Sequence, residues 1–185
     1  MATMMNAADA AIITIVLAED KAIGRTAIQK LIYFETVFDL ADAYFRPHYY
    51  GPYSSEVACI IQELAALGFV EEKTETKETT GYPRKYSYKL TNDGRAFFST
   101  VRKEYAEDYE KISALIEKCK KRSNLNPQIL SWAAKVNYIG SHEEKEALEF
   151  EEIISKAEKL KWDLTQGKIN RASQLLKDLG LVEEI

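Results

Sequence analysis

The stretch HYYGPYSSEVACIIQELAALGFVEE, residues 48–72, decides the fold that the sequence predicts. It opens with an aromatic turn around Gly51 and Pro52, followed by serines that can accept a hydrogen bond from the first turn of a helix. Apolar residues then recur at helical spacing, at Val57, Ile60, Ile61, Leu64 and Leu67. Gly68 closes the helix, because glycine enters the left-handed C-terminal conformation without steric cost. This pattern is typical of a recognition helix that leads into a β-wing.

Two helices are expected before this stretch and a hairpin after it. The first covers residues 7–17 with Asn6 as its cap, and the second starts at a Thr26 cap, with a polar face made of Gln29, Lys30 and Glu35. The sequence predicts two strands, at 70–79 and 84–90, joined by a turn at 80–83. Thr91 is expected to cap a further helix. The order helix, helix, helix, hairpin, helix predicts a mainly α chain with a small β-hairpin, organised as a winged helix-turn-helix.

A long helix and a C-terminal helical module are expected to follow. A long helix with one apolar stripe is predicted from Phe97 to about Arg122. We expect this stripe to be buried against the C-terminal part of the chain or against a second subunit. A short helix is then predicted at 129–139, an acidic amphipathic helix at 143–161, and a last helix between a Thr165 cap and Gly180. The predicted domains are a winged helix-turn-helix at 1–98, a connecting helix at 99–122 and a helical module at 123–185.

The end of the chain resembles its middle. Residues 172–185 match residues 60–73 at a constant offset of 112, with the shared pattern L-x-x-L-G-[LF]-V. There are two explanations for this likeness. Helices that end at a glycine and continue as an extended segment often have similar sequences, or the C-terminal module is a second helix-turn-helix-like repeat without a wing.

Charge and composition limit which molecules the chain is expected to bind and where it is expected to be found. The chain of 185 residues has 25 basic and 29 acidic side chains and a net charge of −4, so DNA binding needs a local basic patch. No apolar stretch is long enough to cross a membrane. The two isolated cysteines, in a chain without an export signal, are typical of reduced thiols. We therefore expect a cytoplasmic protein that does not enter the membrane.

Three blocks of sequence resemble the YwgA-like family. They are GRTAIQKLIYF at 24–34, HYYGPYSSE at 48–56 and YKLTNDG at 88–94. That family is a group of bacterial and archaeal winged-helix proteins regarded as transcription regulators. More distantly, the blocks are similar to those of the Panacea (SocA-type) antitoxins, whose relatives include an adaptor that presents a toxin to a protease. The resemblance implies a DNA-binding regulator or a protein-interaction module.

The residues themselves point to binding rather than to catalysis. Neither His48 nor His142 has an evident nucleophile or paired carboxylate beside it, so we expect no catalytic residue, no metal, no cofactor and no enzymatic activity. The candidate DNA contacts lie on the second helix, the third helix and the hairpin: Arg25, Ser54, Ser55, Gln62, Lys77, Arg84 and Lys85. The third helix has no Lys or Arg between Ser54 and Gly68, so most phosphate contacts are expected from the wing.

Two functions stay open at this point. The first is a winged-helix regulator that binds duplex DNA, as a homodimer through the helix at 95–122 or through the C-terminal helices. The second is a module of antitoxin or adaptor type that binds a protein partner through the aromatic turn or the acidic helices. The acidic net charge favours the second, and the fold favours the first. Tyr49, Tyr50 and Tyr53 are expected to pack between helices two and three rather than to stack on bases.

Overall fold

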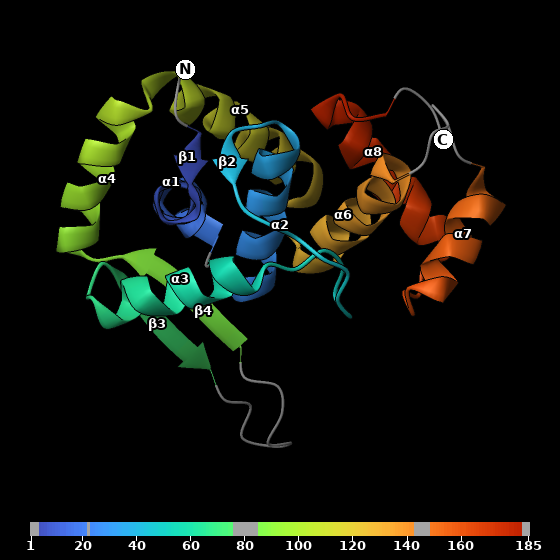
Figure 1. Ribbon diagram of the computed structural model, residues 1–185, viewed down its shortest axis with the longest axis horizontal. Helices are drawn as coiled ribbons and strands as arrows, with labels where there is room; N and C mark the ends of the chain where they lie inside the picture. The colour runs from blue at the N-terminus through green and yellow to red at the C-terminus, as the bar shows by residue number, and fades with distance from the viewer. Residues whose placement is uncertain (1–3, 22, 76–84, 143–148, 183–185) are drawn as a thin grey trace.

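The computed structural model describes residues 4–21, 23–75, 85–142 and 149–182. These residues form a mainly helical fold with a small β-hairpin, as predicted (Figure 1). The helices are α1 (Ala7–Ala18), α2 (Arg25–Val37), α3 (Ser55–Ala66), α4 (Asn92–Glu104), α5 (Ala106–Ser123), α6 (Pro127–Ser141), α7 (Phe150–Lys159) and α8 (Gln166–Leu179), with a 3-10 turn at Glu19–Lys21. Strand β1 (Met5–Asn6) pairs in parallel with β2 (Ala41–Asp42), and β3 (Val70–Glu75) pairs antiparallel with β4 (Lys85–Leu90).

Local capping explains where several of these helices begin. Asn6 accepts hydrogen bonds from the first turn of α1, Thr91 accepts one from Gly94 in α4, and Asn126 caps α6. The second helix differs from the prediction, because Gly24 is its N-cap and Thr26 lies inside the first turn. Among the described residues, no side chain caps α2.

The polar face expected on α2 is buried instead. Gln29, Lys30 and Glu35 are at most 4% exposed, because α2 lies between α1 and the C-terminal helices and is covered on all sides along most of its length (Figure 1). Three buried polar groups on one helix need partners inside the protein. Two of these groups bond the loop that precedes α3.

The helix expected from Phe97 to Arg122 is divided at Tyr105. The Tyr105 backbone has φ −113° and ψ 45°, outside the helical range, and separates α4 from α5. Glu107 and Asp108 then occupy the first turn of α5, where negative charge favours a new helix start. Each helix thus takes its own direction, with α4 packed on α1 and α5 packed on α1 and α8 (Figure 1).

The apolar stripe of α5 is covered by the same chain. Ile112, Leu115, Ile116 and Cys119 are buried within one hydrophobic core that includes residues of α1, α2, α6 and α8. The stripe therefore supplies no argument for a second subunit. Tyr33 of α2 also donates a hydrogen bond to Asn137 of α6, which joins the first half of the chain to the second. The proposed domain boundaries stay a prediction.

The likeness between the middle and the end of the chain holds at the helix ends. Gly68 and Gly180 have φ values of +78° and +79°. The next residue in each case donates its N–H to a leucine carbonyl five positions earlier, Leu64 and Leu176, at 2.9 Å. The packing differs, because α3 lies on α1 while α8 lies on α6 and α5. The shared feature is thus a way of ending a helix, and a true repeat stays a prediction.

Across the described ranges, no helix combines the length and the apolar character needed to cross a bilayer.

Candidate interaction surface

The exposed face of α3 carries polar and acidic side chains. Ser55 and Gln62 are exposed there, as a helix that contacts DNA bases requires. Glu56 and Glu63 are exposed on the same face. Ser54 is only 1% exposed, and its hydroxyl accepts a hydrogen bond from the Val57 N–H as the N-cap of the helix. Ser54 therefore has a structural role, and the α3 face offers no positive charge to a phosphate.

Arg25 is held inside the protein's own network. Its Nε donates to the Tyr88 hydroxyl at 2.5 Å, its Nη2 lies 3.0 Å from Glu72, and its guanidinium stacks on the Tyr86 ring at 3.5 Å. Partial burial disfavours the charged form, but the bonds to Tyr88 and Glu72 outweigh it and raise the pKa of Arg25. The charge is therefore permanent and already paired, which fixes the start of α2 against the hairpin.

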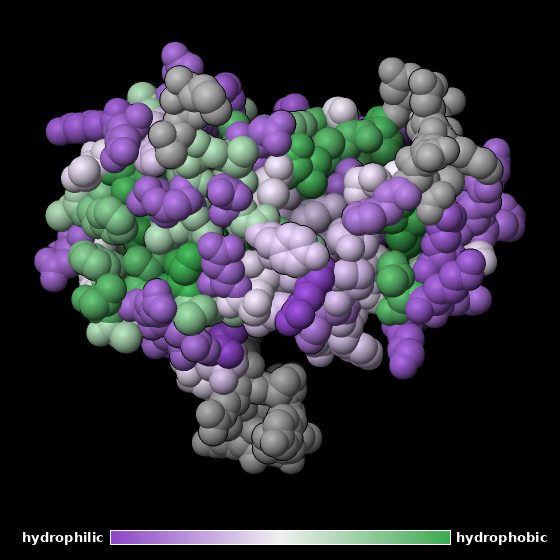
Figure 2. Space-filling view, viewed as in Figure 1, coloured by the Kyte–Doolittle hydropathy of each residue, from purple (hydrophilic) through white to green (hydrophobic). Residues whose placement is uncertain are grey.

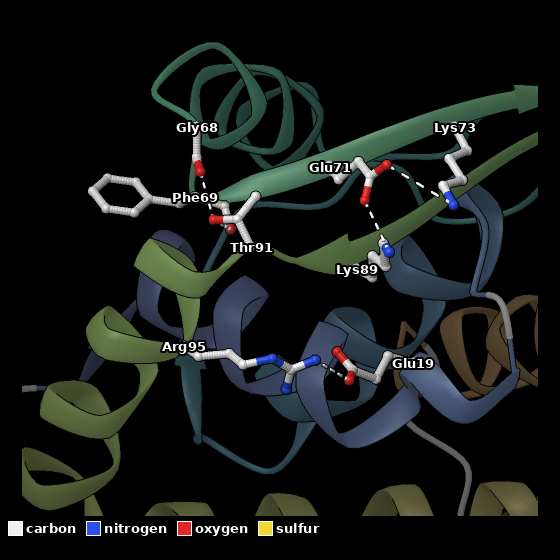
Figure 3. Close-up of polar contacts among 8 residues, drawn as sticks. All are labelled: Glu19, Gly68, Phe69, Glu71, Lys73, Lys89, Thr91 and Arg95. Carbon is white, nitrogen blue, oxygen red and sulfur yellow. Dashed lines mark hydrogen bonds and ion pairs between the residues drawn. The ribbon is translucent and has the colours of Figure 1, made fainter.

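Other cations near the hairpin are also paired with acids. Glu71 on β3 lies 3.0 Å from Lys89 and 3.9 Å from Lys73, and Arg95 of α4 is paired with Glu19 (Figure 3). Exposed pairs of this kind add little stability, yet they reduce the net field of the ribbon. The described part of the hairpin thus has no surplus of positive charge.

The structure describes only part of the remaining candidate DNA contacts on the wing. Lys77 and Arg84 lie outside the described residues, and Lys85 is placed only through its backbone, as the first residue of β4. Of the candidates, Arg25 and Gln62 are brought together, on the border of a small cleft of about 90 Å³ between α2 and α3. The sequence prediction of DNA contacts stays a prediction.

A second surface is built by the loop before α3, residues 46–54, which we call the tyrosine loop. Arg46 and Tyr53 exchange backbone hydrogen bonds of 3.1 and 2.9 Å, and His48 and Gly51 close the turn between them. Gly51 has φ +98°, a conformation that favours glycine. The loop is therefore a short, backbone-bonded hairpin of its own.

Four side chains from elsewhere in the fold bind the backbone of the tyrosine loop. Each donates to a carbonyl of an even-numbered residue: Trp162 to His48 at 2.6 Å, Ser131 to Tyr50 at 2.5 Å, Lys30 to Pro52 at 2.5 Å and Gln29 to Ser54 at 2.8 Å. The amide oxygen of Gln29 also accepts the Ser54 N–H at 2.9 Å. These bonds come from α2, from α6 and from the segment before α8, so both halves of the chain fix the loop.

Lys30 is an unusual anchor because it is 1% exposed and has no acidic partner among the described residues. Burial, with a smaller effect from the charge of Lys135, lowers the pKa of Lys30 to about 7. Near neutral pH its amine therefore donates to the Pro52 carbonyl at a much smaller desolvation cost than a fixed charge would impose. Sequence reasoning missed this role, although the Q-K pair and the Y-G-P turn both lie in the blocks that carry the family resemblance.

Three tyrosine side chains in and beside the tyrosine loop point outward. Tyr44, Tyr49 and Tyr50 are 78%, 69% and 59% exposed, so the expectation that Tyr49 and Tyr50 pack between helices is wrong. The Tyr49 and Tyr50 rings meet edge to face at 4.9 Å, and His48 stacks on Tyr53 at 4.9 Å. Figure 2 shows residues of intermediate hydropathy over the middle of the molecule, where the loop between β2 and α3 crosses in Figure 1.

The described residues form no metal-ligand cluster, and the pKa of both thiols is raised, that of the exposed Cys59 through its hydrogen bond with Glu63. Within those ranges no three His, Cys, Asp or Glu side chains come close enough to hold a metal ion. Cys119 is buried, and burial raises its pKa to about 12, which makes it unreactive. The prediction of no catalytic, metal or cofactor site stays a prediction.

Comparison with known proteins agrees with the sequence blocks. No protein-family model matches the chain. Over 127 residues the chain is 33% identical to the uncharacterized protein YwgA of Bacillus subtilis (strain 168), and the alignment spans 67% of this chain and 71% of that protein. The chain therefore belongs to the YwgA-like family.

Proposed function

We propose that this protein is a protein-interaction module on a winged helix-turn-helix scaffold, which docks its partner through the tyrosine loop. The observation that carries the proposal is the pair of exposed tyrosines, Tyr49 and Tyr50, on a backbone that four buried side chains bond. Tyrosine is enriched at binding hot spots, since its ring contributes large contact area at low cost in conformational entropy. A backbone that is already fixed lowers the entropy lost on docking.

The charge distribution supports a protein partner over DNA. On α3 and the described hairpin the acidic side chains outnumber the basic ones, and Arg25, Lys73 and Lys89 are paired with Glu72 or Glu71. Duplex DNA would meet net negative charge on the described part of this face, which weakens binding at every sequence. An antitoxin or adaptor of the kind implied by the more distant family resemblance needs no such positive face.

DNA binding is the second candidate. The order α1, α2, α3 and the β3–β4 hairpin is that of a winged helix, and Ser55 and Gln62 are exposed on α3. In this alternative Lys77, Arg84 and Lys85 supply the phosphate contacts. A gel-shift experiment with duplex DNA at low salt tests it, with Arg84→Ala and Lys85→Ala as variants. No retardation at micromolar protein would exclude this candidate.

The test of the first proposal is affinity purification of the full chain from its native host. A partner recovered in stoichiometric amount with the wild type should be lost with Tyr49→Ala, with an affinity reduced about tenfold or more. Leu67→Ala is the matched control, because Leu67 is 70% exposed on the far end of α3. Equal recovery with all three proteins would contradict the proposal.

A further inference from the structure

A pocket of about 450 Å³ lies beside the tyrosine loop, between the first turn of α2, the start of α6 and the start of α8. Its polar and aromatic lining includes Thr26, Tyr50, Ser131, Trp132, Lys135 and Lys168. This volume lies in the range of small-molecule sites, which combine apolar walls with a few placed polar groups.

Lys135 is the unusual group in this pocket. It is 8% exposed, and among the described residues its ammonium has no hydrogen-bond or carboxylate partner within contact distance. Its ammonium lies 5.6 Å from the centre of the Trp162 ring, and its stem lies close to Gly51 of the tyrosine loop. A cation so far removed from water without a partner is costly, so the position is suited to receive a negative charge.

A second lysine, Lys168, lines the same pocket, with its ammonium 5.9 Å from the Trp132 ring. It is paired with the Asp163 carboxylate at 2.5 Å, and the Asp163 side chain is 83% exposed. Burial and the charge of Lys168 lower the pKa of Lys135, and the charge of Asp163 opposes them. The pocket therefore has two lysines in its lining, of which Lys168 is paired with Asp163 and Lys135 is not in contact with a described carboxylate.

Helix α2 contributes a further attraction. It has 13 residues, its first turn borders the pocket at Thr26, and among the described residues no side chain caps it. The N-terminus of such a helix carries partial positive charge and favours anions. The start of α6 lies on the same rim at Pro127 and Gln128, although Asn126 already caps its N–H groups.

We propose that this pocket binds a small molecule with a phosphate group, held by Lys135, Lys168 and the start of α2, with a planar part against Trp132. Two lysines and a helix N-terminus suit the spread charge of a phosphate, whereas planar two-oxygen recognition of a carboxylate favours arginine. Tyr50 lines the pocket and its carbonyl is bonded by Ser131, so the ligand would touch the tyrosine loop directly. The inference does not depend on the proposed protein partner.

Both tryptophans of the chain report on the site, since Trp132 lines the pocket and Trp162 lies beside Lys135. The experiment is a fluorescence titration of the full chain with phenyl phosphate, inorganic phosphate and benzoate at constant ionic strength. Phenyl phosphate should give a saturable change and raise the melting temperature. Lys135→Met keeps the buried stem, removes the charge and should weaken binding at least about tenfold.

Lys103→Met, on the exposed surface of α4, is the matched control and should bind like the wild type. No saturable change with the wild type, or equal affinity in Lys135→Met, would overturn the site. Benzoate binding as tight as that of phenyl phosphate would overturn the assignment to phosphate. Saturation by inorganic phosphate alone, at an affinity equal to that of phenyl phosphate, would overturn the contact with Trp132.

Discussion

Glu35 lies in the middle of α2 with no exposed surface, and its only described partner is the hydroxyl of Thr14, 2.6 Å away. The same hydroxyl lies 2.8 Å from the carbonyl oxygen of Ala10, which can only accept a hydrogen bond. One hydroxyl proton satisfies Ala10, so a protonated Glu35 can donate to Thr14, while its other oxygen, Oε2, is buried without a hydrogen-bond partner among the described residues. Burial, which raises the pKa of Glu35 to about 8, is consistent with this neutral acid.

We expect this carboxyl to make the protein less stable as the pH rises. The folded state keeps the proton up to about pH 8, whereas the unfolded chain releases it near 4.5, so its contribution is fully present below 4.5 and declines towards 8. For one proton, the free energy of unfolding decreases by up to about 1.4 kcal/mol per pH unit in this range. Glu35→Gln should remove this part of the slope, as measured by urea unfolding at about pH 5, 6.5 and 8.

Glu110→Gln, at an exposed position of α5, is the control for the loss of one negative charge. If the free energy of unfolding changes with pH in the same way for Glu35→Gln and for the wild type, the proposal that Glu35 is protonated in the folded state is contradicted.

Residue roles were predictable from the sequence only where the partner is local. Asn6, Thr91 and Asn126 bond N–H groups two or three residues away, and their capping roles follow from residue type and position. Gln29 and Lys30 look like an ordinary polar face, because the carbonyls that they bind are more than twenty residues away. Residue type alone does not distinguish a solvated lysine from a buried one.

At the scale of elements, the junction of the hairpin and α4 depends on one glycine. A Cβ added at Gly94 would lie 2.0 Å from the backbone oxygen of Phe69, because the two segments cross where Thr91 bonds the carbonyls of Gly68 and Phe69 (Figure 3). This close approach explains the glycine in the block at 88–94 that carries the family resemblance.

Gly94→Ala should therefore destabilise the protein by about 3 kcal/mol, because the clash is with backbone that cannot rotate away. Gly140→Ala is the control: Gly140 lies in α6 with nothing within 4 Å of the added Cβ. There the alanine should be neutral or stabilise the helix by about 0.5 kcal/mol. Thermal unfolding followed by circular dichroism compares the two, and equal melting temperatures would contradict the close approach.

Elements themselves were predicted well, because periodicity and turns are local signals. The hairpin, α3 and the helix end at Gly180 lie where the pattern places them. The break at Tyr105 was not predictable, since no proline or glycine marks it and the apolar stripe continues across it. Its position follows from the different surfaces that α4 and α5 cover, which only the tertiary packing defines.

For the whole molecule, the shared core predicts one cooperative unfolding transition. The Tyr33–Asn137 and Trp162–His48 bonds join the first half of the chain to the second. Both tryptophans lie after residue 123, so their fluorescence follows the C-terminal helices, while far-UV circular dichroism follows all helices. The two probes should give the same urea midpoint. Two separate midpoints would instead support independent domains at 1–98 and 123–185.

The anchoring of the tyrosine loop has a consequence for how this family can diversify. All four anchoring bonds end on main-chain atoms, which every amino acid provides, and none uses the Tyr49 ring. Substitution of Tyr49 thus leaves the loop's conformation intact while changing the chemistry that it presents. Relatives that keep the anchors at 29, 30, 131 and 162 can therefore vary the chemistry of the loop tip by point mutation without renewed selection for folding.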